Sequence, residues 1–111
     1  MTQTDLFALK ERTVEDADLL QLLDALSQES GWVSARMLHL EHGYSDRYLR
    51  ALAHASEGRI IGGPLGYRLT KLATIEEVNR AIKSLESQAR RMKLRADQVR
   101  AVLNGARQGA A

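Results

Sequence analysis

The feature that most constrains the fold is an unbroken helical pattern near the C-terminus, over residues 74–104. The sequence TIEE at residues 74–77 is a capping box that starts a helix, and no glycine or proline follows before Gly105. Apolar or small residues then recur at spacings that alternate strictly between three and four, which is typical of a coiled-coil seam. The seam residues are Ile75, Val78, Ile82, Leu85, Ala89, Met92, Ala96, Val99 and Leu103. We therefore expect one long helix here.

The length of this helix predicts a partner for it. About 30 residues would span about 45 Å, whereas the 70 or so residues before them would form a globule only about 30 Å across. The far end must extend beyond its own domain, where an exposed seam is costly in water. A second copy of the helix is the natural cover. We therefore expect a homodimer through Ile82, Leu85, Ala89, Met92, Ala96, Val99 and Leu103.

The direction of helix pairing is suggested by the flanking residues. In a parallel pair, Arg95 and Arg100 would occupy facing positions and repel each other. An antiparallel pair could use Ala89 and Ala96 for close approach of the two backbones. Antiparallel pairing is favoured, and parallel pairing stays open.

Residues 34–56 predict two short helices joined by a tight turn. Ser34 and Ser45 are each placed to cap the helix that follows. Gly43 lies two residues before the second cap, where glycine readily takes the positive φ of a helix exit. Apolar residues on both segments fit two helices packed at a steep angle, as in a helix-turn-helix. They are Met37, Leu38, Leu40, Tyr44, Tyr48, Leu49, Leu52 and Ala53.

The glycine-rich sequence RIIGGPLGYRLT follows directly, and with it residues 13–72 resemble the winged helix-turn-helix family. One departure is His39, where such motifs usually carry a small residue. The resemblance implies a mainly α fold with a small β-hairpin (α+β), and a minimal strand near Val33 that joins the hairpin. The expected segments are an N-terminal arm, the winged helix-turn-helix domain, the long coiled-coil-like helix and a flexible tail, over residues 1–12, 13–73, 74–104 and 105–111.

The first core helix is expected to begin at a second capping box, TVED, with Thr13 as the cap, and to end near Glu29. Its leucines fall on one broad face, which predicts that they are buried. They are Leu19, Leu20, Leu22, Leu23 and Leu26. Trp32 lies between two helices and is expected in the core rather than stacked on a base.

The second helix of the motif carries the candidate recognition residues. With its apolar side turned inward, the 3.6-residue repeat turns Arg47, Arg50 and His54 outward. In the major groove an arginine can bond a guanine through two acceptors at once. The other interpretation is that Arg47 and Arg50 are solvated surface residues, either unpaired or paired with Asp46 or Glu41.

The hairpin supplies the remaining candidate contacts of this domain. Ile60 and Leu69 are expected to face the core, while Arg59 and Arg68 face outward onto phosphates. Together with Ser45 they complete the candidate DNA-binding set. The glycines do not form a P-loop, because no GK[ST] follows them. The tip carries no charge, unlike wings that grip phosphate.

Charge is segregated along the chain. Residues 1–30 hold two basic and seven acidic residues, residues 31–73 hold six and three, and residues 74–111 hold eight and four. The basic part is suited to a polyanion such as DNA. The densest basic cluster could add phosphate contacts that are independent of sequence; equally, it could keep the coiled coil soluble or pair with the acidic first helix. Its candidate phosphate contacts are Arg90, Arg91, Lys93 and Arg95.

Other classes of protein are disfavoured. The chain has no cysteine, which excludes disulfides and thiolate zinc sites. Its first residues lack the basic start and long apolar run of a signal peptide, and no apolar run is long enough for a membrane span, so we expect neither. His39 and His42 lie one helical turn apart, but no third metal ligand is near them in sequence. No catalytic constellation stands out, so we expect neither an enzyme nor a cofactor. The expected location is the cytoplasm, associated with the nucleoid.

Two functions are consistent with these patterns. The favoured one is sequence-specific binding of double-stranded DNA by a homodimeric transcriptional regulator, on a palindromic site. The competing one is a winged-helix protein-interaction module that recruits a partner through its long C-terminal helix. The uncharged tip and the unusual length of that helix are the features that keep this competing function open.

Overall fold

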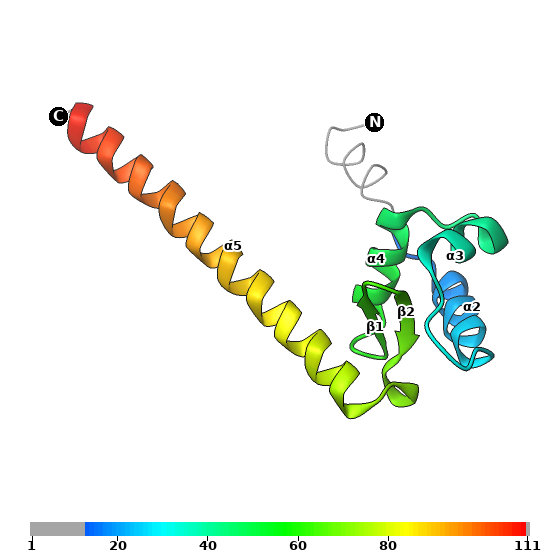
Figure 1. Cartoon of the computed structure of the whole chain (residues 1–111). Coiled ribbons are helices and arrows are strands. Elements are labelled where there is room, and N and C mark those ends of the chain that lie inside the picture. Colours follow the sequence, from blue (N-terminus) through cyan, green and yellow to red (C-terminus); the bar gives the residue numbers. More distant parts are fainter. Residues whose placement is uncertain (1–12, 111) are drawn as a thin grey trace, which may run out of the picture. The chain divides into compact units, whose positions relative to one another are not determined.

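The computed structural model describes the backbone of residues 13–110 and the side chains of residues 13–106. The chain is mainly helical with one small antiparallel hairpin (Figure 1). It divides between Val78 and Asn79 into two compact units, each described here by itself. The elements are α2 (Asp16–Ser27), α3 (Ala35–His42), α4 (Asp46–Ala55), β1 (Ile60–Gly63), β2 (Gly66–Leu69), a 3₁₀ turn (Thr70–Leu72) and α5 (Ile75–Ala110).

One apolar cluster holds the first unit together. α4 lies against α2, α3 and β1, and α2 also lies against β2. The buried side chains at the centre of the cluster come from all of these elements, and the expected packing of α3 on α4 is confirmed for most of its residues. They are Leu22, Leu26, Leu38, Tyr44, Tyr48, Leu49, Leu52, Ile60 and Leu69.

The turn between α3 and α4 has the predicted caps. The hydroxyl of Ser34 accepts a hydrogen bond from the backbone N–H of Met37, and that of Ser45 accepts one from Tyr48, both at 3.1 Å. Gly43 ends α3 with a φ of 75°. The two caps satisfy backbone N–H groups that a helix start otherwise leaves without partners.

The start of α2 differs from the prediction. The helix begins at Asp16 after Glu15, which makes no side-chain capping bond, so the proposed Thr13 capping box is wrong. The backbone N–H of Glu15 instead donates to the hydroxyl of Tyr48 at 3.2 Å. The start of α2 is therefore bonded to a residue of α4 that lies 33 positions away, which the local sequence does not reveal. It ends at Ser27, two residues before the predicted end.

Three apolar side chains predicted to be buried are exposed: Leu20, Met37 and Leu40. The helical repeat turns the chain by about 100° per residue. Leu20 therefore lies well off the stripe formed by Leu22 and Leu26, and the short α3 buries only one residue of its α-helical segment, Leu38. The predicted apolar faces were too wide.

The hairpin has a two-residue turn at Pro64 and Leu65. Ile60 pairs with Leu69, both are buried as expected, and Gly63 pairs with Gly66 at the turn. The expected minimal strand is a single bridge, in which Val33 and Tyr67 exchange backbone hydrogen bonds of 2.9 and 2.8 Å.

Trp32 lies outside the core cluster, contrary to the prediction. It is half-buried, and its ring lies against Gly63, where an added Cβ would be 3.3 Å from the indole. The indole N–H donates to the carboxylate of Glu77 at the start of α5. A tryptophan with a polar partner at its edge is well placed at a partly wet site of this kind.

The capping box at the start of α5 is confirmed. The backbone N–H of Thr74 donates to Glu77 at 2.9 Å, and that of Glu77 donates to the Thr74 hydroxyl at 3.1 Å. The helix passes the predicted end at residue 104 and continues through Ala110, so the tail expected to be flexible is helical up to that residue. Its 36 residues span about 54 Å.

The structure also bears on the termini and on the membrane. The predicted N-terminal arm, residues 1–12, lies outside the described residues.

Within the part of the chain that is described, no helix is both long enough and apolar enough to cross a membrane.

Replacement of Gly66 by alanine should unfold the hairpin. Gly66 has a φ of 123°, and an added Cβ would lie 2.0 Å from the Val33 carbonyl oxygen. We expect Gly66→Ala to lower the free energy of unfolding in urea by about 3 kcal/mol or more. Gly31→Ala is the control, since a Cβ there meets nothing within 4 Å, and it should change the free energy by less than about 0.5 kcal/mol. Equal effects of the two substitutions would contradict the tight Val33 bridge.

Candidate nucleic-acid interface

The side of α4 that faces solvent is determined by the side that packs into the core. Tyr48, Leu49 and Leu52 are buried at about the spacing of the helical repeat, so the rotation of α4 about its axis is set by the core. Arg47, Arg50 and His54 are exposed, as the sequence predicts. The structure therefore brings these three side chains onto one accessible side of the helix.

The arginines of α4 are not held by carboxylates. The ion pairs within residues 13–106 join Glu41 to His42, and Asp97 to both Lys93 and Arg100. Pairing of Arg47 or Arg50 with Asp46 or Glu41 is therefore wrong for the described structure, whereas the interpretation that both are solvated surface residues stays open. Two cations without a countercharge remain available to an external anion or base edge.

Ser45 is exposed at the start of α4, next to these arginines. Its hydroxyl oxygen already accepts the capping bond from Tyr48. The hydroxyl hydrogen is not needed for the cap and can still donate to a phosphate oxygen. Its place in the candidate set remains a prediction.

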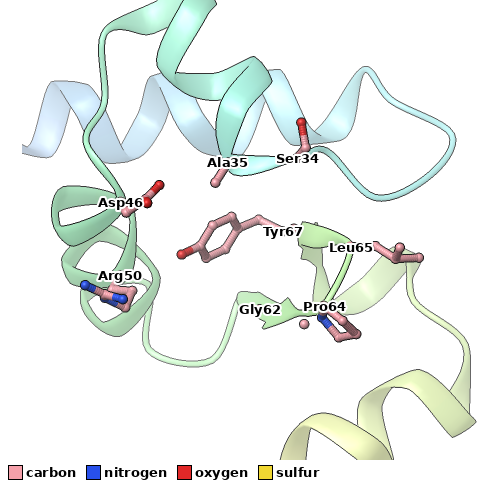
Figure 2. A pocket seen from close by; sticks show the side chains of 10 residues that line it. Ser34, Ala35, Asp46, Arg50, Gly62, Pro64, Leu65 and Tyr67 are labelled. Carbon is pink, nitrogen blue, oxygen red and sulfur yellow. The ribbon is translucent and has the colours of Figure 1, made fainter.

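A pocket of about 280 Å³ lies between the starts of α3 and α4 and the tip of the hairpin (Figure 2). The aromatic ring of Tyr67 enters it from β2, and its hydroxyl points toward α4, which carries Asp46 and Arg50. Leu65 at the tip points away from the pocket. The lining residues are Ser34, Ala35, Asp46, Arg50, Gly62, Gly63, Pro64, Leu65, Gly66 and Tyr67.

Tyr67 is the site residue that sequence reasoning missed. It lies two residues before the buried Leu69 on the same strand, so it shares the inward face of the hairpin. That alternation was the available signal. Its position next to α4 depends on the bridge to Val33, which no local pattern specifies.

The surroundings of Tyr67 raise its pKa and so favour the neutral form of its hydroxyl. Burial raises the pKa of Tyr67 above its ordinary value of 10.0, and the negative charge of Asp46 raises it further, whereas the positive charge of Arg50 lowers it. At neutral pH the phenol therefore carries its proton and can donate a hydrogen bond. The pocket offers one cation, one anion and one neutral donor side by side.

The hairpin arginines also have structural roles. The Nε of Arg59 donates to the Ser56 carbonyl, and the Nη2 of Arg68 donates to the Leu72 carbonyl, each at 2.8 Å. Arg68 is half-buried rather than outward as expected, and its Nη1 is buried without a hydrogen-bond partner among the described residues. Arg59 is exposed. Phosphate contacts by the two residues remain a prediction, which the exposure of Arg59 suits better.

The two histidines of α3 are engaged within the fold. The Nδ1 of His39 lies 3.1 Å from the carbonyl oxygen of Tyr44, and the ring of His42 stacks on that of Tyr44 with centroids 5.5 Å apart. In the part of the chain that the structure describes, no three His, Asp or Glu side chains gather where they could hold a metal ion.

The second unit presents an uncovered apolar seam. Leu85, Met92 and Val99 are 62%, 72% and 62% exposed. Part of the seam forms a shallow groove of about 510 Å³ along one side of α5. The residues of this groove are Met92, Arg95, Ala96, Val99, Arg100 and Leu103.

The basic cluster of α5 is partly neutralised. Asp97 lies 3.6 Å from Lys93 and 2.9 Å from Arg100, one turn to either side. Arg90 donates to the Ser87 hydroxyl at 3.1 Å. Among the described residues, Arg91 and Arg95 have no such partner. These two are the strongest of the predicted phosphate contacts on this helix.

Comparisons with protein-family models, with curated proteins and with solved structures found no match to this chain. A functional assignment therefore depends on the physical features of the molecule. The informative ones are the arginines of α4 without ion pairs, the Tyr67 pocket and the uncovered seam of α5.

The charges around Tyr67 can be tested without any ligand. Arg50→Ala should raise the pKa of Tyr67 further, because the positive charge that favours the phenolate is removed. Asp46→Asn should lower it, because a repelling negative charge is removed. The measurement is an NMR pH titration of tyrosine resonances, with Tyr67→Phe to assign the signal. Arg80→Ala is the control, and equal pKa values in all four proteins that retain Tyr67 would contradict the arrangement.

Proposed function

We propose that this chain is a winged helix-turn-helix protein that binds double-stranded DNA as a homodimer and regulates transcription. The observation that carries the proposal is the exposed pair Arg47 and Arg50, free of ion pairs among the described residues, at the start of α4. The order of elements supports it, since two capped helices joined at Gly43 are followed by a hairpin that Val33 extends by one bridge. DNA as partner would place the protein in the cytoplasm, on the nucleoid.

In this proposal α4 is the recognition helix. Its N-terminal half enters the major groove, where Arg47 and Arg50 reach base edges and phosphates, and His54 in the last turn adds a contact on the same side. Arg59 on the hairpin, with Arg91 and Arg95 on α5, would add contacts to phosphate that do not depend on sequence. No cofactor and no catalytic step is part of the mechanism.

The homodimer is supported by the exposed seam of α5. Large apolar side chains recur along one side of the helix, and a second copy with the same seam is complementary to it. Two copies would present two recognition helices, and a protein with two-fold symmetry binds half-sites separated by whole turns of DNA. One α4 offers few base contacts, so specificity would come from the pair.

The ion pairs on α5 affect whether two copies of the helix would pair in parallel or antiparallel. Arg95 and Arg100 would repel in a parallel pair, but Asp97 lies 2.9 Å from Arg100 and offsets part of its charge. The repulsion therefore weighs less than the sequence suggests. Close approach through Ala89 and Ala96 is the remaining argument for an antiparallel pair.

A second candidate function is a protein-interaction module that recruits a partner through α5. The hairpin tip favours it, because Pro64 and Leu65 are exposed and carry no charge for phosphate. The same apolar seam that suits a second copy would suit an amphipathic helix of another protein.

The DNA proposal predicts a specific effect of the α4 arginines. The parent protein should bind random duplex DNA with an affinity that falls as salt rises. Arg47→Ala combined with Arg50→Ala should weaken this binding and lower its salt slope by about 1 for each arginine removed, because two cations leave the interface. The measurement is fluorescence anisotropy of a labelled duplex at several salt concentrations.

The matched control for that experiment is Arg80→Ala combined with Lys83→Ala. Both residues are exposed on α5, and the pair removes the same charge outside the proposed interface. Absence of binding by the parent at low salt would refute the DNA proposal. Equal weakening in the two double variants would refute the role of α4 and favour general electrostatic binding.

The homodimer predicts that a charge within the seam separates the copies. Met92→Glu should convert a dimer into a monomer, because the carboxylate would be buried between two apolar seams. Leu94→Glu is the control: Leu94 is exposed and apolar but lies off the seam, so the dimer should survive. Light scattering at tens of micromolar, with circular dichroism to check helix content, measures both. A monomeric parent would overturn the prediction.

A further inference from the structure

The negative charge of Asp46 is unexpected on a surface that is proposed to bind DNA. It is exposed in the first turn of α4, where a carboxylate helps to stabilise the helix start, and it lies on the same pocket as Arg50. If α4 meets DNA, this carboxylate is brought toward a polyanion and is repelled by it. Such a residue is unfavourable on a DNA-binding face unless it makes a contact of its own.

Asp46 and Arg50 are four residues apart on one helix, a spacing at which opposite charges usually pair. They do not pair here, since neither takes part in an ion pair within the described residues. Asp46, Arg50 and Tyr67 all line one pocket, and Figure 2 shows the ring of Tyr67 entering it from β2 with the hydroxyl toward α4. Asp46 and Arg50 are both exposed, so the carboxylate and the guanidinium are both accessible to an external partner.

The chemistry of DNA bases provides partners for this pair. In the major groove, guanine presents two acceptors that suit an arginine, and cytosine presents an amino donor that suits a carboxylate. Adenine also presents an amino group, but its neighbouring N7 acceptor would repel a carboxylate and suits asparagine instead. One turn of helix advances about 5 to 6 Å, which is between one and two base-pair steps.

We propose that the Asp46, Tyr67 and Arg50 pocket reads a guanine and a cytosine within one or two base pairs of each other in the half-site. Arg50 donates to the O6 and N7 of the guanine, and Asp46 accepts from the N4 amino group of the cytosine. Tyr67 is a positioning residue that keeps the two apart. This inference rests on the proposed function, because it assigns base preferences to the same α4 surface.

The test is a selection of duplexes from a randomised library by the full chain and its variants. The parent should enrich a half-site with a guanine and a cytosine at these neighbouring positions. Asp46→Asn should shift the cytosine position toward adenine, with a change in relative affinity of about tenfold, since asparagine bonds adenine through N6 and N7. Arg50→Ala should abolish the guanine preference alone.

Two variants of Tyr67 separate positioning from simple structural support. Tyr67→Ala should weaken both base preferences, because Asp46 and Arg50 can then pair. Tyr67→Phe keeps the ring and should retain both preferences. Arg80→Ala is the control: Arg80 is exposed on α5 outside the proposed interface, so its removal should leave these two positions unchanged. Circular dichroism melting should confirm that every variant is folded.

The outcomes distinguish the inference from the function on which it rests. If the parent enriches no duplex even at low salt, the proposed function and the inference both fail. If the parent enriches a half-site but Asp46→Asn leaves it unchanged, only the inference is overturned. Equal base preferences in Tyr67→Ala and Tyr67→Phe would overturn the spacer role of Tyr67.

Discussion

Burial of one side of α4 is the constraint on which the first unit depends. Leu49 and Leu52 are fully buried, and Tyr48 is nearly so while its hydroxyl also bonds Asp18 on α2. A helix held by three neighbours cannot rotate without breaking several of these contacts at once. The outward direction of its arginines is therefore a consequence of core packing, although the arginines themselves contribute nothing to the core.

The sequence predicted what is decided locally. The serine caps of α3 and α4, the glycine exit of α3 and the Thr74 capping box each involve residues within a few positions of one another, and all are present. The facing of Ile60 and Leu69 followed from simple alternation. The exposure of Leu20, Met37 and Leu40 was missed because the predicted apolar faces were too wide. Two other missed features depend on residues distant in sequence. At the start of α2, the backbone N–H of Glu15 donates to the hydroxyl of Tyr48, and Tyr67 is held by its bridge to Val33.

The candidate site divides in the same way. Helical periodicity predicted that Arg47 and Arg50 are exposed, because that needs only the inward residues of one helix. It could not predict the pocket, which needs α3, α4 and the hairpin together. Trp32 shows the limit of reasoning from position in the sequence. Its place between two helices suggested the core, whereas its indole N–H donates to a carboxylate 45 residues away at the start of α5.

The bond between Trp32 and Glu77 has a practical consequence. The carboxylate of Glu77 also receives the backbone N–H of Thr74, and these hydrogen bonds hold its pKa below the ordinary value. Trp32 is the only tryptophan of the chain, and its ring lies on Gly63 of the hairpin. Its intrinsic fluorescence therefore observes the hairpin and the first turn of the long helix together. The molecule carries its own optical probe of the place where its two units join along the chain.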